Sequence, residues 1–430
     1  MILGAIGLAV LLLVAFIGVP LGLTMMIVGF GGFAVVRGTD AAIAMVGQTI
    51  TSNSMSYGFI VVPLFVLMGN FIFRADLARD LYRASYTWFG RYPGGLAMST
   101  IVACGGFSAV SGSSVATAAT MGKVAYPEMR RYGYSASISA GTIAAGGTIG
   151  ILIPPSVVLV LYGLLIEGDI GALFIAGIVP GVLSVLSYLL LIALLCWIKP
   201  DLGPRGEVFP MSERLASIKG IWPIMVLFLF VIGGIYFGIF TPTEAGGIGA
   251  VGALGFCLLR RRMTWSVFFE SIFEAGKMSA MIFTVALGAL IFSNFVEIAR
   301  MPSELEAWVE SMNLAPMTVM WLILAIYLVL GCVFDGPAMV LLTVPLFAPL
   351  VELLGFDLIW FGIVVVIVTE ISMVTPPVGI NAFVMKSVLP EVSLGEIFKG
   401  IAPFWVADIA RLLIIVLYPP VVLYLPTLMG

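Results

Sequence analysis

The chain has 430 residues, of which 61% are hydrophobic and 10% are charged, and its mean hydropathy is +1.17. Such values lie far outside globular usage and are typical of proteins that cross a membrane several times. The formal net charge is −3 and histidine is absent, which argues against nucleic acid as a partner and excludes histidine as a catalytic base, metal ligand or haem ligand.

The first half of the chain contains apolar segments long enough to cross a hydrocarbon core of about 30 Å. They occupy residues 2–18, 20–36, 59–73, 96–126, 138–166 and 170–198. Residues 74–91 set charged side chains against Leu77, Leu81 and Trp88, which predicts an amphipathic helix in the membrane interface. Residues 199–219 form the one clear hydrophilic linker.

The second half repeats this order of segments. Its apolar segments are 221–240, 245–259, 278–296, 317–354, 358–389 and 401–425, with amphipathic arms at 260–277 and 300–313. Prolines recur at a spacing of 222 residues, in the pairs Pro20 and Pro242, Pro127 and Pro349, and Pro154 and Pro376. We therefore predict an internal duplication, with a first repeat at 1–198, a linker at 199–219 and a second repeat at 220–430.

Two of the apolar segments contain residues that break helices. Glycines and the pair Pro154–Pro155 interrupt 138–166, and Pro376–Pro377 interrupts 358–389. A broken helix leaves backbone groups that lipid cannot satisfy, so it survives only where protein surrounds it or where it lines a polar cavity. Paired broken helices in corresponding halves are a sequence signature of a transporter's binding site.

The charges predict the orientation of two further interrupted segments, 96–126 and 317–354. Lysine and arginine flank the first, whereas glutamate and aspartate flank the second. Because basic loops stay in the cytoplasm, the two segments are expected to enter from opposite faces. The prediction is an all-α polytopic membrane protein: an inverted repeat with about ten transmembrane helices, two re-entrant hairpins, two broken helices and both termini outside.

The hairpin tips and the helix breaks are the candidate sites. Hydroxyls and freed carbonyls around Ser111 and Ser113 suit a hard cation such as sodium. Asp335 occupies the equivalent position in the second hairpin, where a helix-capping role and an ion-binding role are compatible. Glu370 lies beside the second break, and we expect it to pair with a lysine or to lie in solvent.

The half-helices that start at the tips and breaks predict an anionic solute. Helix N-termini carry partial positive charge and unpaired N–H groups, and here they follow Ser113, Pro155, Pro337 and Pro377. We therefore predict an anion coupled to sodium. A proton could replace sodium only through Asp335 or Glu370, since histidine is absent.

Three motifs give the chain a specific resemblance. Residues 105–117 read GGFSAVSGSSVAT, residues 153–156 read IPPS, and residues 375–379 read TPPVG. Together they resemble the large membrane subunit of tripartite ATP-independent periplasmic (TRAP) transporters, over essentially the whole chain. The resemblance implies an elevator-type secondary transporter of the bacterial inner membrane, driven by sodium ions and not an enzyme. It also implies a separate small membrane subunit of four helices and a periplasmic substrate-binding protein that delivers a carboxylate solute.

The resemblance also implies positions for the ions and the solute. The first sodium site would use Ser111, Ser113, Gly150, Ile153 and Pro155, several of them through backbone carbonyls. The second would use Asp335, Gly336, Met373 and Thr375. The solute would contact Ser113, Ser114, Ser156, Asp335 and Pro337.

Other functions remain open from the residues alone. A stand-alone sodium/dicarboxylate symporter would share the same hairpins without a binding protein. An ion channel is disfavoured because a selectivity filter needs symmetric rings of carbonyl or carboxylate groups, and the two hairpin tips differ in sequence. An intramembrane hydrolase would need a base for Ser111 or Ser113, and without histidine only a lysine or a carboxylate could serve, with Lys123 the nearest in sequence. An anion pocket of backbone and hydroxyl groups suits C4-dicarboxylates, keto acids, sugar acids and sialic acids alike.

Overall fold

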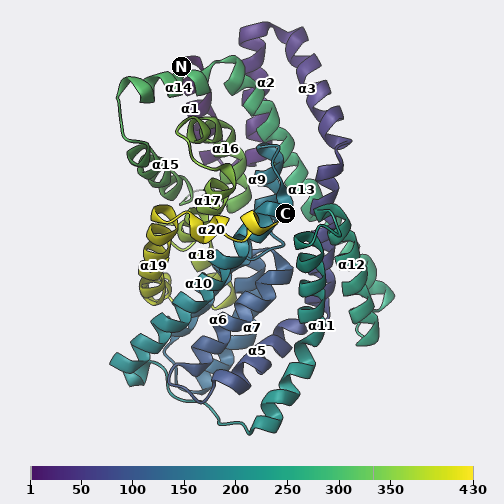
Figure 1. Cartoon of the computed structure of the whole chain (residues 1–430), viewed down its shortest axis with the longest axis vertical. Coiled ribbons are helices and arrows are strands. Elements are labelled where there is room, and N and C mark those ends of the chain that lie inside the picture. Colours follow the sequence, from purple (N-terminus) through teal and green to yellow (C-terminus); the bar gives the residue numbers. More distant parts are fainter. Residues whose placement is uncertain (1, 333, 430) are drawn as a thin grey trace.

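The computed structural model describes residues 2–332 and 334–429, and for Val110 the backbone alone. These residues form twenty α-helices and four short 3-10 helices, and strands are absent from this described part (Figure 1). Seven of the described helical segments are long and apolar enough to cross a membrane, and six further apolar helices are shorter. The predicted all-α architecture is confirmed.

The helices of the first half follow the predicted segments closely. They are α1 (Ile2–Phe16), α2 (Leu21–Arg37), α3 (Thr39–Ser54), α4 (Val61–Arg74), α5 (Leu77–Phe89), α6 (Gly95–Ser111), α7 (Ser114–Arg131), α8 (Ala136–Thr148), α9 (Val157–Leu165) and α10 (Ile170–Ile198). The first interrupted segment becomes the hairpin α6–α7. The first broken helix becomes α8 and α9, joined through a 3-10 turn at Ile149–Ile151 and a cis Pro154–Pro155 bond.

The helices of the second half repeat the hairpin and the break. They are α11 (Met211–Tyr236), α12 (Pro242–Leu259), α13 (Trp265–Ile298), α14 (Met301–Ser311), α15 (Pro316–Leu330), α16 (Gly336–Leu353), α17 (Leu358–Ser372), α18 (Ile380–Val388), α19 (Leu394–Leu417) and α20 (Pro420–Leu423). The second hairpin is α15–α16. The second broken helix is α17 and α18, again joined through a cis Pro376–Pro377 bond.

The structure differs from the sequence analysis at two boundaries. Most of the residues predicted as an arm and a separate crossing, 260–277 and 278–296, lie in the single 34-residue helix α13, which begins at Trp265. Nothing between them breaks a helix, and the polar residues Glu270 and Glu274 pair with Arg74 of α4 at 3.0 and 2.8 Å. Similarly, α11 begins at Met211, inside the segment predicted as linker.

The remaining linker is held against the first half of the chain. The Gly206 N–H donates to the Gly90 carbonyl at 2.8 Å, and the Gly94 N–H donates to the Gly203 carbonyl at 2.8 Å. The Tyr132 hydroxyl donates to Glu207 Oε1 at 2.6 Å. This hydrogen bond raises the pKa of the Tyr132 phenol above its usual value. The linker therefore has a defined path.

The two halves of the chain are interleaved. Helix α2 packs against α13, α4 packs against both α12 and α13, and α8 packs against α19. In Figure 1 the purple helices α2 and α3 accordingly lie beside green α13, while blue α5–α7 lie beside teal α11 and α10. The larger hydrophobic core draws its residues from both halves, whereas a smaller cluster around Ile101, Tyr134 and Tyr188 comes almost wholly from the first half.

Helices α8 and α19 approach closely through two glycines. A Cβ at Gly400 would overlap the Ser137 carbonyl oxygen, and a Cβ at Gly141 would overlap the Gly400 backbone. Small residues at such crossings let membrane helices pack backbone to backbone. This crossing holds α19 against the first broken helix.

We expect Gly400→Ala to destabilise the protein because the obstructing atoms belong to backbone, which cannot rotate away. Overpacking of this kind typically costs about 1–3 kcal/mol, which thermal unfolding of the purified protein in detergent would detect. Gly395→Ala on the same helix is the matched control, since nothing lies within 4 Å of a Cβ there. Equal midpoints for the two variants would contradict the close crossing.

Candidate functional site

The tip of the first hairpin is a short turn that is held by local hydrogen bonds. Gly112 ends α6 in the left-handed region, with φ 57°, and Ser113 caps α7 by accepting the Ala116 N–H at 3.3 Å. The Ser111 and Thr117 hydroxyls lie 3.0 Å apart, and Thr117 donates to the Ser113 carbonyl at 2.8 Å. Local hydrogen bonds thus fix the hydroxyls that the sequence singles out.

The tip rests directly on the first break. A Cβ at Gly150 would come within 3.0 Å of the Ser113 carbonyl, and a Cβ at Gly112 within 2.9 Å of the Pro155 carbonyl. Four of the predicted ligands of the first sodium site therefore lie together: Ser111, Ser113, Gly150 and Pro155. The Ile153 side chain instead packs against Gly181 of α10, which leaves its backbone as the part available to an ion.

Ser156 has a structural role in this arrangement. It is buried, donates to the Ile151 carbonyl at 2.5 Å and accepts the Leu159 N–H at 3.4 Å as the N-cap of α9. Its hydroxyl therefore stabilises the break and the half-helix that follows.

The second hairpin presents a carboxylate at its tip. Asp335 occupies the N-cap position of α16, but its side chain makes no capping hydrogen bond there. It is exposed, and ion-pair partners for it are absent among the described residues. Asp335 is thus the N-cap residue of α16 by its position in the backbone, but its side chain does not cap the helix. The carboxylate remains available to a ligand.

The second break is held in place by a hydrogen bond from a residue of α19. The Thr375 hydroxyl donates to the Ile371 carbonyl at 2.6 Å and accepts the Trp405 indole N–H at 2.9 Å. A hydroxyl oxygen with these two bonds keeps one lone pair for a further partner. Gly379, at φ 58°, opens α18.

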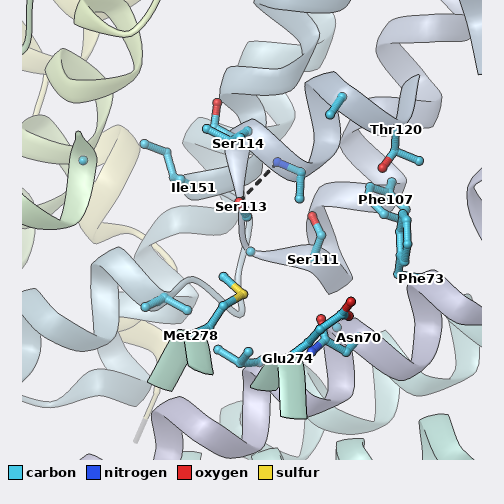
Figure 2. Close-up of a pocket in the computed structure, with 18 of the residues that line it drawn as sticks. Asn70, Phe73, Phe107, Ser111, Ser113, Ser114, Thr120, Ile151, Glu274 and Met278 are labelled. Carbon is cyan, nitrogen blue, oxygen red and sulfur yellow. Dashed lines mark hydrogen bonds between the residues drawn. The ribbon is translucent and has the colours of Figure 1, made fainter. Parts of the chain in front are cut away.

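One cavity of about 650 Å³ lies between the two tips and helices α4 and α13 (Figure 2). Its walls include seven of the predicted site residues. These are Ser111, Ser113, Ser114, Asp335, Gly336, Pro337 and Met373. The other five predicted residues do not line it, namely Gly150, Ile153, Pro155, Ser156 and Thr375. The volume is in the range of small-molecule sites.

Four ionisable side chains line the cavity, and two of them are already paired. Glu274 pairs with Arg74 at 2.8 Å, and Asp76 lies 3.9 Å from Arg79 and 4.0 Å from Arg262. Lys123 and Asp335 have no ion-pair partner within the described part of the chain. The cavity therefore offers one cation and one anion to ligands.

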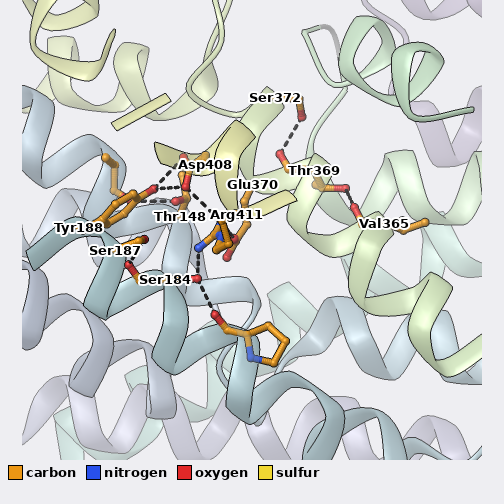
Figure 3. Close-up of polar contacts among 12 residues, drawn as sticks. Thr148, Ser184, Ser187, Tyr188, Val365, Thr369, Glu370, Ser372, Asp408 and Arg411 are labelled. Carbon is orange, nitrogen blue, oxygen red and sulfur yellow. Dashed lines mark hydrogen bonds and ion pairs between the residues drawn. The ribbon is translucent and has the colours of Figure 1, made fainter. Parts of the chain in front are cut away.

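A buried group of charges lies behind the second break, on α17, α19 and α10 (Figure 3). Arg411 pairs with Glu370 at 2.9 Å and with Asp408 at 3.1 Å, and it contacts the Ser184 hydroxyl. The Tyr188 hydroxyl lies 2.7 and 2.8 Å from the two Asp408 oxygens.

The expectation that Glu370 pairs with a lysine or lies in solvent is wrong. Its partner is an arginine, and the exposed side-chain fraction is 0% for Glu370 and 4% for Arg411. Asp408 and Arg411 are the only charged residues in the apolar segment 401–425 and lie three positions apart. Membrane charges that pair with each other show this pattern, so this spacing is the sequence signal for the buried pair.

Residues 8–421 match the family described as "Tripartite ATP-independent periplasmic transporter, DctM component". The C4-dicarboxylate TRAP transporter large permease protein DctM of Pseudomonas aeruginosa is 34% identical over 380 residues, which are 88% of each chain. The isethionate TRAP transporter permease protein DctMQ of Oleidesulfovibrio alaskensis is 32% identical, over 95% of this chain and 64% of that one. The sialic acid TRAP transporter permease protein SiaT of Haemophilus influenzae is 29% identical, over 99% and 68%.

Two solved transporters share the fold. The Alcanivorax borkumensis YdaH transporter matches 88% of each chain with a TM-score of 0.66 and 12% sequence identity. Neisseria gonorrhoeae MtrF, described as one of a class of antimetabolite efflux pumps, matches 88% of this chain and 84% of its own with a TM-score of 0.55 and 12% identity. At this identity the likeness concerns the fold alone, which is that of multi-pass membrane transporters.

We expect Arg411→Met to destabilise the protein strongly, because it leaves two buried carboxylates without their counter-charge. Breaking a buried ion pair from one side typically costs about 3–5 kcal/mol, measurable as a lower midpoint of thermal unfolding. Arg262→Met is the control, since its arginine is 61% exposed and 4.0 Å from Asp76, and should change stability by less than about 1 kcal/mol.

A triple variant tests whether charge is the cause. Glu370→Gln, Asp408→Asn and Arg411→Met together remove all three charges, so the triple variant should be more stable than Arg411→Met alone. If the triple variant is no better, packing and not charge explains the loss.

Proposed function

The chain belongs to the DctM component family of tripartite ATP-independent periplasmic transporters, and from this membership we propose that it imports an organic acid anion, driven by a sodium gradient. In this proposal a periplasmic binding protein delivers the solute, and a small membrane subunit of four helices completes the complex. The complex resides in a bacterial inner membrane, and both ends of this chain face the periplasm. The chain carries out transport and no covalent chemistry.

The cavity between the two hairpin tips is the observation that carries this proposal. It brings together an unpaired lysine and an unpaired aspartate with the starts of two half-helices, α7 and α16. An anion is favoured near Lys123 and near the α7 N-terminus, where N–H groups and the helix dipole point outward. A cation is favoured near Asp335. One cavity thus suits an anion and a cation at the same time, as co-transport requires.

The first sodium site in this proposal lies between the tip of hairpin α6–α7 and the first break. The close approach of Gly150 to the Ser113 carbonyl and of Gly112 to the Pro155 carbonyl supports it, because it concentrates backbone oxygens beside the Ser111 hydroxyl. Sodium is a hard cation and prefers such all-oxygen surroundings.

The second sodium site in this proposal uses Asp335, Gly336, Met373 and Thr375. The unpaired Asp335 carboxylate and the remaining lone pair of the Thr375 hydroxyl support it. The two sites then differ in charge, since the first relies on neutral oxygens and the second on a carboxylate. The solute would sit beside both, against Ser113, Ser114 and Pro337.

An elevator movement is the proposed mechanism. The hairpins and broken helices pack on one another, as in the contacts of α7 with α8, α18 with α7, and α16 with α9 and α17. Helices α4 and α13 form the opposite wall of the cavity. In the proposal the first group slides as a unit along the wall formed by α4 and α13.

Uptake into proteoliposomes tests the proposal. The chain is reconstituted with its small subunit, a sodium gradient is imposed, and radiolabelled C4-dicarboxylate, isethionate and sialic acid are supplied with and without their binding proteins. We expect uptake of one solute only when sodium and a binding protein are both present. Sodium-driven uptake without any binding protein would favour the stand-alone symporter instead. No sodium dependence would overturn the coupling.

Asp335→Asn tests the second sodium site. Losing the carboxylate's charge should raise the sodium concentration for half-maximal uptake by roughly tenfold, equivalent to about 1.4 kcal/mol. Asp201→Asn is the matched control, because Asp201 is exposed in the linker, far along the chain from the tips. An unchanged sodium requirement in Asp335→Asn would remove this residue from the site.

A further inference from the structure

Asn381 connects the two halves of the candidate site. It lies at the start of α18, directly after the second break, and its exposed fraction is 0%. Its amide nitrogen donates to the Ser114 hydroxyl at 2.7 Å and to the Ala144 carbonyl at 3.1 Å. Because a carbonyl only accepts hydrogen bonds, the contact with Ala144 fixes which way the amide is turned.

The Asn381 backbone makes a second connection. Its N–H donates to the Met373 carbonyl at 3.0 Å, across the Pro376–Pro377 loop. One residue therefore touches the second break through its main chain and the first hairpin and first broken helix through its side chain. The surrounding contact of α18 with α7 is apolar, with Gly122 facing Met385 and Val388.

Two of the three partners of Asn381 belong to or adjoin the proposed ion ligands. Met373 is itself proposed for the second sodium site, and Ser114 follows Ser113 of the first. Asn381 Oδ1 accepts no hydrogen bond from the described residues, so the side chain is held only by its two donor contacts. A shift of the Met373 carbonyl can therefore reach the start of α7 through Asn381.

We propose that Asn381 couples the two sodium sites, so that sodium bound at either site raises the affinity of the other. The inference rests on the proposed function of the cavity and extends it to a property that neither site has alone. Sodium at the second site would fix the Met373 carbonyl, which sets the position of Asn381. The amide then holds Ser114, and with it the adjoining Ser113, in place for the first ion. Such coupling is reciprocal and typically changes an affinity by about 5- to 150-fold.

The test measures sodium binding by the native complex without solute, as the sodium-dependent rise of its thermal unfolding midpoint, and measures the sodium dependence of uptake in parallel. The native complex should show a Hill coefficient above about 1 for sodium. Asn381→Ala keeps the backbone bond to Met373 and removes the side chain, and Ser114→Ala removes only the acceptor on the hairpin. In both variants the Hill coefficient should fall towards about 1, and the half-saturating sodium concentration should rise at least about 5-fold.

Asn294→Ala is the matched control. Its amide also joins two helices, from α13 to the Thr49 hydroxyl of α3 at 3.3 Å, but it does not line the cavity. It should keep the native Hill coefficient, which separates coupling from a general loss of stability. If Asn381→Ala does not fold, Ser114→Ala carries the test.

The outcomes distinguish this inference from the proposed function. Native sodium-driven uptake with unchanged Hill coefficients in folded Asn381→Ala and Ser114→Ala overturns the coupling and leaves the transporter proposal standing. A native Hill coefficient of about 1 also overturns it. Uptake that ignores sodium in the native complex overturns both.

Discussion

A polar backbone group inside a membrane must find its partner within the protein, and this constraint organises the whole chain. Each helix break exposes carbonyl and N–H groups at membrane depth. The first break is covered by the tip of hairpin α6–α7, which is why glycine occupies both Gly112 and Gly150: a Cβ at either position would meet backbone within about 3.0 Å. The second is covered by α18 and by Trp405. Each helix break therefore depends on the segment that packs against it.

Interactions that are local in sequence were predictable. The α10 boundaries, the two tips and the two breaks follow from hydrophobic length and from proline and glycine. The continuous α13 was missed because the charged residues from Arg260 to Lys277 indicated a separate amphipathic arm, whereas Arg74 of α4 pairs with Glu270 and Glu274 within this segment. The Glu370 partner and the Asn381 contacts were missed for the same reason. They join residues 41 and 267 positions apart, and such pairings are set by the fold.

The buried charges and the charges of the candidate site differ in whether they are paired. Arg411 pairs with the carboxylates of Glu370 and Asp408, and Tyr188 and Ser184 lie beside them, so this charge group joins α10, α17 and α19. Lys123 and Asp335 face the cavity with their charges unused. The charges behind the break are thus paired with one another, whereas the two in front of it have no ion-pair partner among the described residues.

The composition of the cavity wall has an evolutionary consequence. The tips and breaks supply one side, while Asn70, Phe73, Met278 and Met281 of α4 and α13 supply the other. Substitutions on this second side can reshape the space for a solute while the first side keeps its turns, caps and breaks. Relatives named for C4-dicarboxylate, isethionate and sialic acid share the family. In the proposed transporter, such a division between two walls would allow the solute to change while the tips and breaks are kept.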